Sequence, residues 1–80
     1  MTEPKASVSG AEIRQTRAAL GMSQAAFAAL LGYSRKATIS ELENGHAEPT
    51  PPVLVMLVHL RELVHLRRDV ASILAELKAR

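Results

Sequence analysis

Cysteine and tryptophan are absent from this chain of 80 residues, and phenylalanine and tyrosine occur once each. A secreted domain of this size usually needs disulfides to compensate for its small core, so the lack of cysteine favours a reducing compartment and a cytoplasmic location. Because aromatic rings are so few, aliphatic side chains and alanine must fill the core, which suits closely packed helices. The hydrophobic share of 48% is enough for one small core. The composition therefore predicts one all-α domain.

The chain also lacks a long apolar run and a strong charge of either sign. Its most apolar stretch, residues 53–58, is followed by His59. It is far shorter than the roughly 20 residues of a membrane-spanning helix. We therefore expect no membrane partner. The formal net charge is only +2, and residues 1–48 carry five basic and five acidic side chains. Binding to nucleic acid would depend on the placement of the basic side chains rather than on their number.

Groups that could support catalysis or hold a metal are scarce. His59 and His65 are six positions apart and lie on different faces of any helix, and no cysteine could join them as a ligand. Glu41 and Glu43 diverge on a helix in the same way. The chain has no glycine-rich phosphate loop and no nucleophile paired with a base. We therefore expect neither an enzyme nor a cofactor or metal site.

The first quarter of the chain predicts a tail followed by a helix. Residues 1–8 have no apolar periodicity, and we expect them to be disordered. Ser9 and Glu12 have the spacing of a capping box, in which each side chain accepts a hydrogen bond from the backbone of the other residue. A helix that begins there and ends near Gly21 has one apolar face, made of Ile13, Thr16 and Leu20.

Two short helices joined by a turn are predicted between Ser23 and Gly45. Ser23 is a favourable first cap, and Gly32 is placed where a left-handed residue ends a helix. The apolar stripe of the first helix consists of Ala25, Phe27, Ala28 and Leu31, and that of the second consists of Ile39 and Leu42. Helices joined by so short a turn cross steeply, which leaves one face of the second helix free. This is helix-turn-helix geometry.

The C-terminal segment predicts either one long helix or two helices. Thr50 and Pro51 make a typical helix start, and no glycine or asparagine follows. The polar cluster at residues 65–69 could break the helix, so the fold has either four helices with a long last one or five helices. Apolar residues recur at spacings of three and four, interrupted by Arg67, at Val53, Met56, Leu60, Leu63, Val70, Leu74 and Leu77.

This seam predicts a homodimer. It offers more apolar surface than a monomer of this length can easily bury, although core packing within a five-helix domain is the alternative. The expected interface residues are Met56, Leu60, Leu63, Val70, Leu74 and Leu77.

Residues 13–45, IRQTRAALGMSQAAFAALLGYSRKATISELENG, resemble the Cro and phage-repressor helix-turn-helix family, also called the xenobiotic-response-element type. The resemblance is strongest at Arg17, Gly21, Ser23-Gln24 and Glu43-Asn44-Gly45, and EPTPPVL resembles the start of the family's fourth helix. It implies a sequence-specific transcriptional regulator, a repressor, that binds a pseudo-palindromic double-stranded DNA operator as a dimer. It also implies a structural ion pair between Arg17 and Glu43.

By this resemblance, residues 9–64 form the DNA-binding domain, and the apolar seam predicts that residues 65–80 form a helix for dimerisation. The start and outer face of the second helix of the pair would enter the major groove. Ile39 follows Gly32 by seven positions, whereas the family's spacing is six, so alignment from either end gives a different register, and only Lys36 is included in both. The expected base or groove contacts are Arg35, Lys36, Ala37, Thr38, Ser40 and Glu41.

Phosphate contacts are expected beside these positions, at Arg14, Gln24, Asn44 and His46. Each of these side chains could instead be an ordinary exposed residue. A second function also stays open, because the weak net charge and the apolar C-terminal segment are typical of a protein-interaction module. Such a module would bind a toxin or another protein partner, as antitoxins of this family do.

Overall fold

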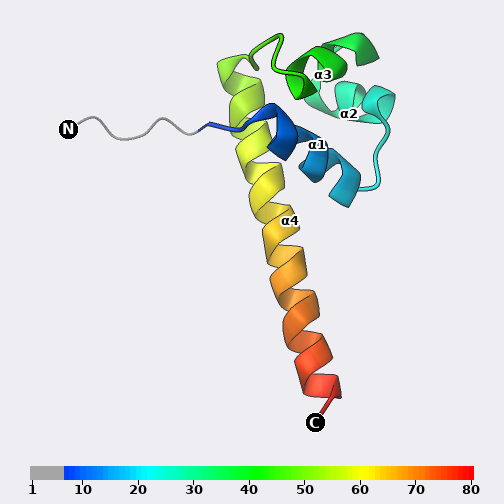
Figure 1. Cartoon of the computed structure of the whole chain (residues 1–80), viewed down its shortest axis with the longest axis vertical. Coiled ribbons are helices and arrows are strands. Elements are labelled where there is room, and N and C mark those ends of the chain that lie inside the picture. Colours follow the sequence, from blue (N-terminus) through cyan, green and yellow to red (C-terminus); the bar gives the residue numbers. More distant parts are fainter. Residues whose placement is uncertain (1–6) are drawn as a thin grey trace, which may run out of the picture.

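The computed structural model describes residues 7–80, which form four helices and no strands. Helices α1 (Gly10–Ala19), α2 (Gln24–Leu31) and α3 (Lys36–Glu43) gather beside the first half of α4 (Pro51–Lys78), and the second half of α4 extends beyond them (Figure 1). The all-α prediction with a long last helix is confirmed. The break considered near residues 65–69 is absent, because α4 is continuous through that segment.

The helix boundaries follow the predicted capping residues. Ser9 Oγ accepts a hydrogen bond from the Glu12 amide at 3.1 Å, and the Ser9 amide donates to Glu12 Oε1 at 3.1 Å, which completes the capping box. Ser23 Oγ likewise accepts from the Ala26 amide at 3.1 Å. Gly32 ends α2 with a φ of 86°, a left-handed conformation that favours glycine. Local sequence therefore fixes where α1 and α2 start and where α2 ends.

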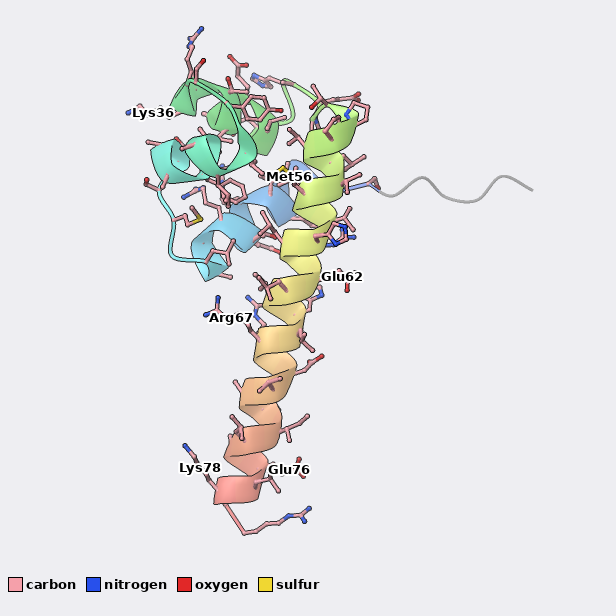
Figure 2. The ribbon with its side chains drawn as sticks, turned by 180° about the vertical axis from the view of Figure 1, so that it is seen from behind. Lys36, Met56, Glu62, Arg67, Glu76 and Lys78 are labelled. Atoms are coloured by element: carbon pink, nitrogen blue, oxygen red, sulfur yellow. The ribbon has the colours of Figure 1, made fainter. Side chains whose placement is uncertain are left out.

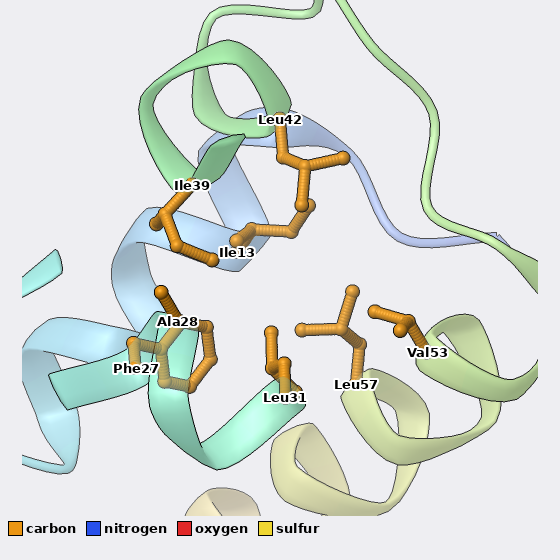
Figure 3. Close-up of a cluster of buried hydrophobic side chains, with 8 residues drawn as sticks. All are labelled: Ile13, Phe27, Ala28, Leu31, Ile39, Leu42, Val53 and Leu57. Carbon is orange, nitrogen blue, oxygen red and sulfur yellow. The ribbon is translucent and has the colours of Figure 1, made fainter. Parts of the chain in front are cut away.

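The four helices share one core (Figure 3). The predicted stripes of α1, α2 and α3 are confirmed, except that Ala25 is exposed and lies outside the core. Because Ile39 and Leu42 are buried, α3 is held by one side and its other side remains free. The core residues are Ile13, Phe27, Ala28, Leu31, Ile39, Leu42, Val53 and Leu57.

The start of the described chain is anchored to α4. Residues 1–6 of the expected disordered tail lie outside the described residues, and the other two do not fit that expectation. Val8 packs, partly buried, against the core. Arg61 Nη1 donates to the Ser7 carbonyl oxygen at 3.1 Å and to Glu12 Oε2 at 2.8 Å. A side chain far along the sequence thus fixes this segment, and no local pattern could reveal that contact.

Helix α4 changes character after Val64, which is its last buried residue. Every residue from His65 to Arg80 is exposed. Leu60, which we assigned to the dimer seam, instead packs partly buried against the core, because it lies on the side of α4 that faces α1 to α3. No helix within residues 7–80 is long and apolar enough to cross a membrane.

Candidate nucleic-acid interface

Helix α3 begins at Lys36, the residue that both alignments of the turn include. Arg35 is its N-cap, with an extended backbone (φ −133°, ψ 133°) and no side-chain capping hydrogen bond. Tyr33, Ser34 and Arg35 therefore make the connection after Gly32. Figure 2 shows Lys36 at the outer edge of the molecule, away from α4. Two basic side chains, both exposed, thus lie at the free end of α3.

The remaining predicted base contacts divide by exposure. Glu41 is exposed, whereas Ala37, Thr38 and Ser40 are partly buried. Four residues lie on the side of α3 opposite the buried Ile39, and we call them the free face of α3. They are Ala37, Ser40, Glu41 and Asn44. Thr38 is not part of the free face, because it lies toward the side of Leu42.

A buried carboxylate holds the C-terminal end of α3 against α1 and α2. The Glu43 side chain is 1% exposed, and Arg17 Nε donates to its Oε2 at 2.6 Å while Arg17 Nη2 donates to Oε1 at 3.1 Å. Arg17 Nη1 also donates to the Met22 carbonyl oxygen at 3.0 Å. The pair implied by the resemblance is therefore present in bidentate form, the geometry that makes such pairs strong.

Two residues expected to contact phosphate also donate to Glu43. Arg14 Nε and Gln24 Nε2 each reach Oε1 at 3.4 Å. We call Arg14, Arg17, Gln24 and Glu43 the Glu43 cluster. Of its three donors, Arg14 is the loosest, because its side chain is 60% exposed. The cluster joins α1, α2 and α3 through one carboxylate.

The pKa of Glu43 reflects two opposed effects. Burial by itself raises the pKa of this carboxyl group, but the hydrogen bonds from Arg17, Gln24 and Arg14 and the charge of Arg17 outweigh burial, so the pKa is lowered. The same pair raises the pKa of Arg17, chiefly through its hydrogen bond to Glu43. Both side chains are therefore charged at neutral pH.

The other two expected phosphate contacts lie just after α3. Asn44 and His46 are both exposed. Asn44 Nδ2 donates to Ser40 Oγ at 3.4 Å, and the Asn44 amide donates to the Ser40 carbonyl oxygen at 3.0 Å. The structure thus brings Arg14, Gln24 and Asn44 to one end of α3, about 10 Å from the basic pair at the other end.

The sequence predicts no role for Gly10, the first residue of α1. A Cβ atom built at Gly10 would lie 2.9 Å from the Leu42 carbonyl oxygen and closer still to that of Glu43. The start of α1 therefore touches the backbone at the end of α3, and only glycine fits there. The sequence gives one sign of this contact. Gly10 directly follows the capping Ser9, at a position where the helix itself does not require glycine.

The sequence profile of the helix-turn-helix family of the Cro and phage-repressor type matches residues 13–60, more than half of the chain. The chain belongs to this family. Membership implies DNA as the binding partner. Among curated proteins and among solved structures, the chain has no match.

The helix-turn-helix match also divides α4. It includes most of α1, all of α2 and α3, and α4 as far as Leu60. Residues 61–80 lie beyond it, and they include the whole continuously exposed part of α4, which starts at His65. Family membership therefore accounts for the α2–α3 pair and not for the second half of α4.

Proposed function

We propose that this helix-turn-helix protein is a transcriptional repressor that binds a pseudo-palindromic DNA operator as a homodimer. The observation that carries the proposal is the free face of α3 together with the exposed Arg35 and Lys36 at the start of the helix, because the core and the Glu43 cluster fix α3 from behind. A helix held in this way can enter the major groove as a rigid unit. Arginine and lysine donate to the O6 and N7 atoms of guanine or to phosphate.

Each subunit would read one half-site. A two-fold symmetric protein binds half-sites whose centres are about 34 Å apart, one turn of the double helix. In each half-site, Lys36 and Arg35 would contact bases, and Glu41 would accept a hydrogen bond from a cytosine amino group. Backbone phosphates would be contacted by the exposed Asn44 and His46, by the exposed part of Arg14 and by the partly buried Gln24. Contact with about six phosphates would give a salt slope near −5.

Selection of bound sequences from a random duplex pool tests the proposal directly. We expect an enriched motif with two-fold symmetry. Substitution Lys36→Glu should then weaken binding to the selected duplex at least about 100-fold, because both half-sites lose a donor and gain a repulsive charge. Lys78→Glu is the matched control, because it makes the same charge change at the opposite end of the molecule (Figure 2). Its binding should stay within about threefold of wild type.

The result that would overturn this proposal is a pool without enrichment, or a Lys36→Glu protein that binds as tightly as the Lys78→Glu protein. The chain would then be better described as a protein-interaction module of the antitoxin kind. The observation that favours this second function is the row of large apolar side chains that α4 exposes beyond Val64. Binding of a different protein by α4, with no selected DNA sequence, would support it.

A further inference from the structure

Five of the exposed large apolar residues of α4 form a stripe with a heptad repeat, whereas Val55 and Leu74, which are also exposed, lie on its flanks. The spacings within the stripe alternate between three and four residues, and each of its side chains is 46% to 60% exposed. The stripe consists of Leu63, Leu66, Val70, Ile73 and Leu77. Met56, 37% exposed, extends it by one heptad toward the N-terminus, and His59 is the polar member of the second row. The stripe spans about 32 Å, or three heptads.

This register differs from the seam that spacing alone predicts. In that seam, one row begins with Met56 and Leu63. The other row contains Leu60, Arg67 and Leu74. Leu60 is turned toward the core, however, and of its row only Leu74 is an exposed apolar residue, whereas Leu66 and Ile73 are both exposed. When Leu66 and Ile73 form the second row, Arg67 is no longer an exception in the seam. It becomes a flanking residue, where coiled coils carry charge.

The stripe is accessible along its whole length. Val53, Leu57 and Val64 turn toward α1 to α3, and none of them belongs to either row of the stripe. On a helical projection the stripe is centred more than a quarter of a turn away from these three residues. A second helix can therefore lie along α4 without displacing the core.

The two flanks of the stripe carry charges of opposite sign. Glu62, Asp69 and Glu76 precede the first row, and Arg67 follows the second row. Figure 2 shows Glu62 and Glu76 on one side of α4, with Arg67 and Lys78 on the other. Within residues 7–80 neither Glu62 nor Arg67 forms an ion pair, and neither has an oppositely charged residue three or four positions away.

We infer that α4 binds α4 of a second copy of this chain as a parallel, in-register, two-stranded coiled coil. In that arrangement Glu62 of each copy lies beside Arg67 of the other, so two ion pairs form. In an antiparallel pair the acidic flank would face the acidic flank of the partner. The parallel pair also places both groups of α1 to α3 at the same end. The inference rests on the proposed dimer and adds its direction and register.

Cysteine cross-linking tests the direction, because the chain has no cysteine of its own. Leu66→Cys and Ile73→Cys are prepared separately, oxidised, and analysed on non-reducing gels. In a parallel, in-register pair each introduced thiol faces its own copy, so both variants should form covalent dimers nearly completely. In an antiparallel pair a residue faces its own copy only at the midpoint of the overlap. Residues 66 and 73 are about 10 Å apart along α4, so at most one of the two variants could cross-link. Ser72→Cys, on the outer side of α4, is the control and should remain monomeric on the gel.

Charge reversal tests the register independently. Glu62→Arg and Arg67→Glu should each weaken self-association about tenfold in sedimentation experiments, because two attractive pairs become repulsive. The double variant Glu62→Arg/Arg67→Glu should return to within about twofold of wild type. Leu63→Asp in the stripe should abolish self-association. A double variant no tighter than the single variants would overturn the register.

The inference fails if the wild-type chain is monomeric at high micromolar concentration. It also fails if either Leu66→Cys or Ile73→Cys does not cross-link. Its failure can be distinguished from that of the proposed function. Binding to the selected duplex without these cross-links overturns the coiled coil alone. Efficient cross-linking of both variants without any selected duplex overturns the DNA-binding function alone.

Discussion

Two regions of this protein have equally apolar sequences and opposite surroundings. In the region that ends at Val64, apolar side chains from four helices meet in one core. From His65 to Arg80, side chains of the same kinds are all exposed. Helical periodicity marks an apolar face in both regions, but only the first region has other helices of its own chain to cover it. An apolar stripe therefore predicts that a helix face will be buried. Whether helices of the same chain cover that face depends on how the whole chain folds.

The largest expected difference between the two regions is the cost of truncating an isoleucine. Ile39 is 0% exposed and Ile73 is 56% exposed. Ile39→Ala removes buried methyl groups and leaves a cavity, so it should lower the free energy of unfolding by about 3 to 4 kcal/mol. Ile73→Ala should change it by less than about 0.5 kcal/mol in protein diluted until stability no longer depends on concentration. Urea unfolding followed by circular dichroism measures both values.

Equal costs at the two positions would contradict the division at Val64. A second comparison uses concentrated protein, in which dimerisation should make the wild type more stable than in dilute solution. The Ile73→Ala variant should lose this increase in stability. The Ile39→Ala variant should retain the increase as long as it folds.

Much of the first region was predictable from local sequence. Ser9, Glu12, Ser23 and Gly32 act within a few residues of their position, so their spacing alone places the ends of α1 and α2. The core stripes follow from a period that any helix imposes on its own sequence. The pairing of Arg17 with Glu43 joins residues far apart in the chain, and only the family resemblance indicated it.

Other features depend on how the helices lie against one another, and no local pattern carries that information. Gly10 is required by a carbonyl oxygen of α3, and Arg61 contacts Glu12 across the α1–α4 packing. Leu60 and Leu66 fit the spacing of a seam equally well. Only the position of the core shows that the first is covered and that the second is exposed.

The Glu43 cluster offers a second way to disrupt the first region. Arg17→Ala should lower the free energy of unfolding by about 3 kcal/mol, because it leaves a buried carboxylate without its main partner. Arg14→Ala is a matched control that removes an arginine from the same carboxylate. The Arg14 contact is 3.4 Å long and its side chain is 60% exposed, so the cost should stay below about 1 kcal/mol. Thermal unfolding of both variants checks the order, and an unchanged melting temperature for Arg17→Ala would count against the pairing.

The smallest expected effect is the pH dependence that Glu43 gives to the first region. Because the pKa of Glu43 is lowered in the folded protein, ionised Glu43 stabilises the fold above its ordinary pKa of 4.5, and this contribution is lost as the pH falls through the folded value. The melting temperature of wild type should therefore decrease below about pH 4.5, and Glu43→Gln should decrease less steeply although it is less stable at neutral pH. Some slope should remain, since the pKa of Glu12 is also lowered, first by its hydrogen bond with the Ser9 backbone and then by Arg61.

The exposed region provides the control for this titration. Glu76 is 72% exposed, and its only described ion pair is a 4.0 Å contact with Arg80, so water already solvates its charge. Glu76→Gln should therefore give the same melting curve as wild type at each pH. If the curve of Glu76→Gln flattened as much as that of Glu43→Gln, the acid sensitivity would arise from the overall charge of the protein. A flattening confined to Glu43→Gln would assign it to the one carboxylate that joins α1, α2 and α3.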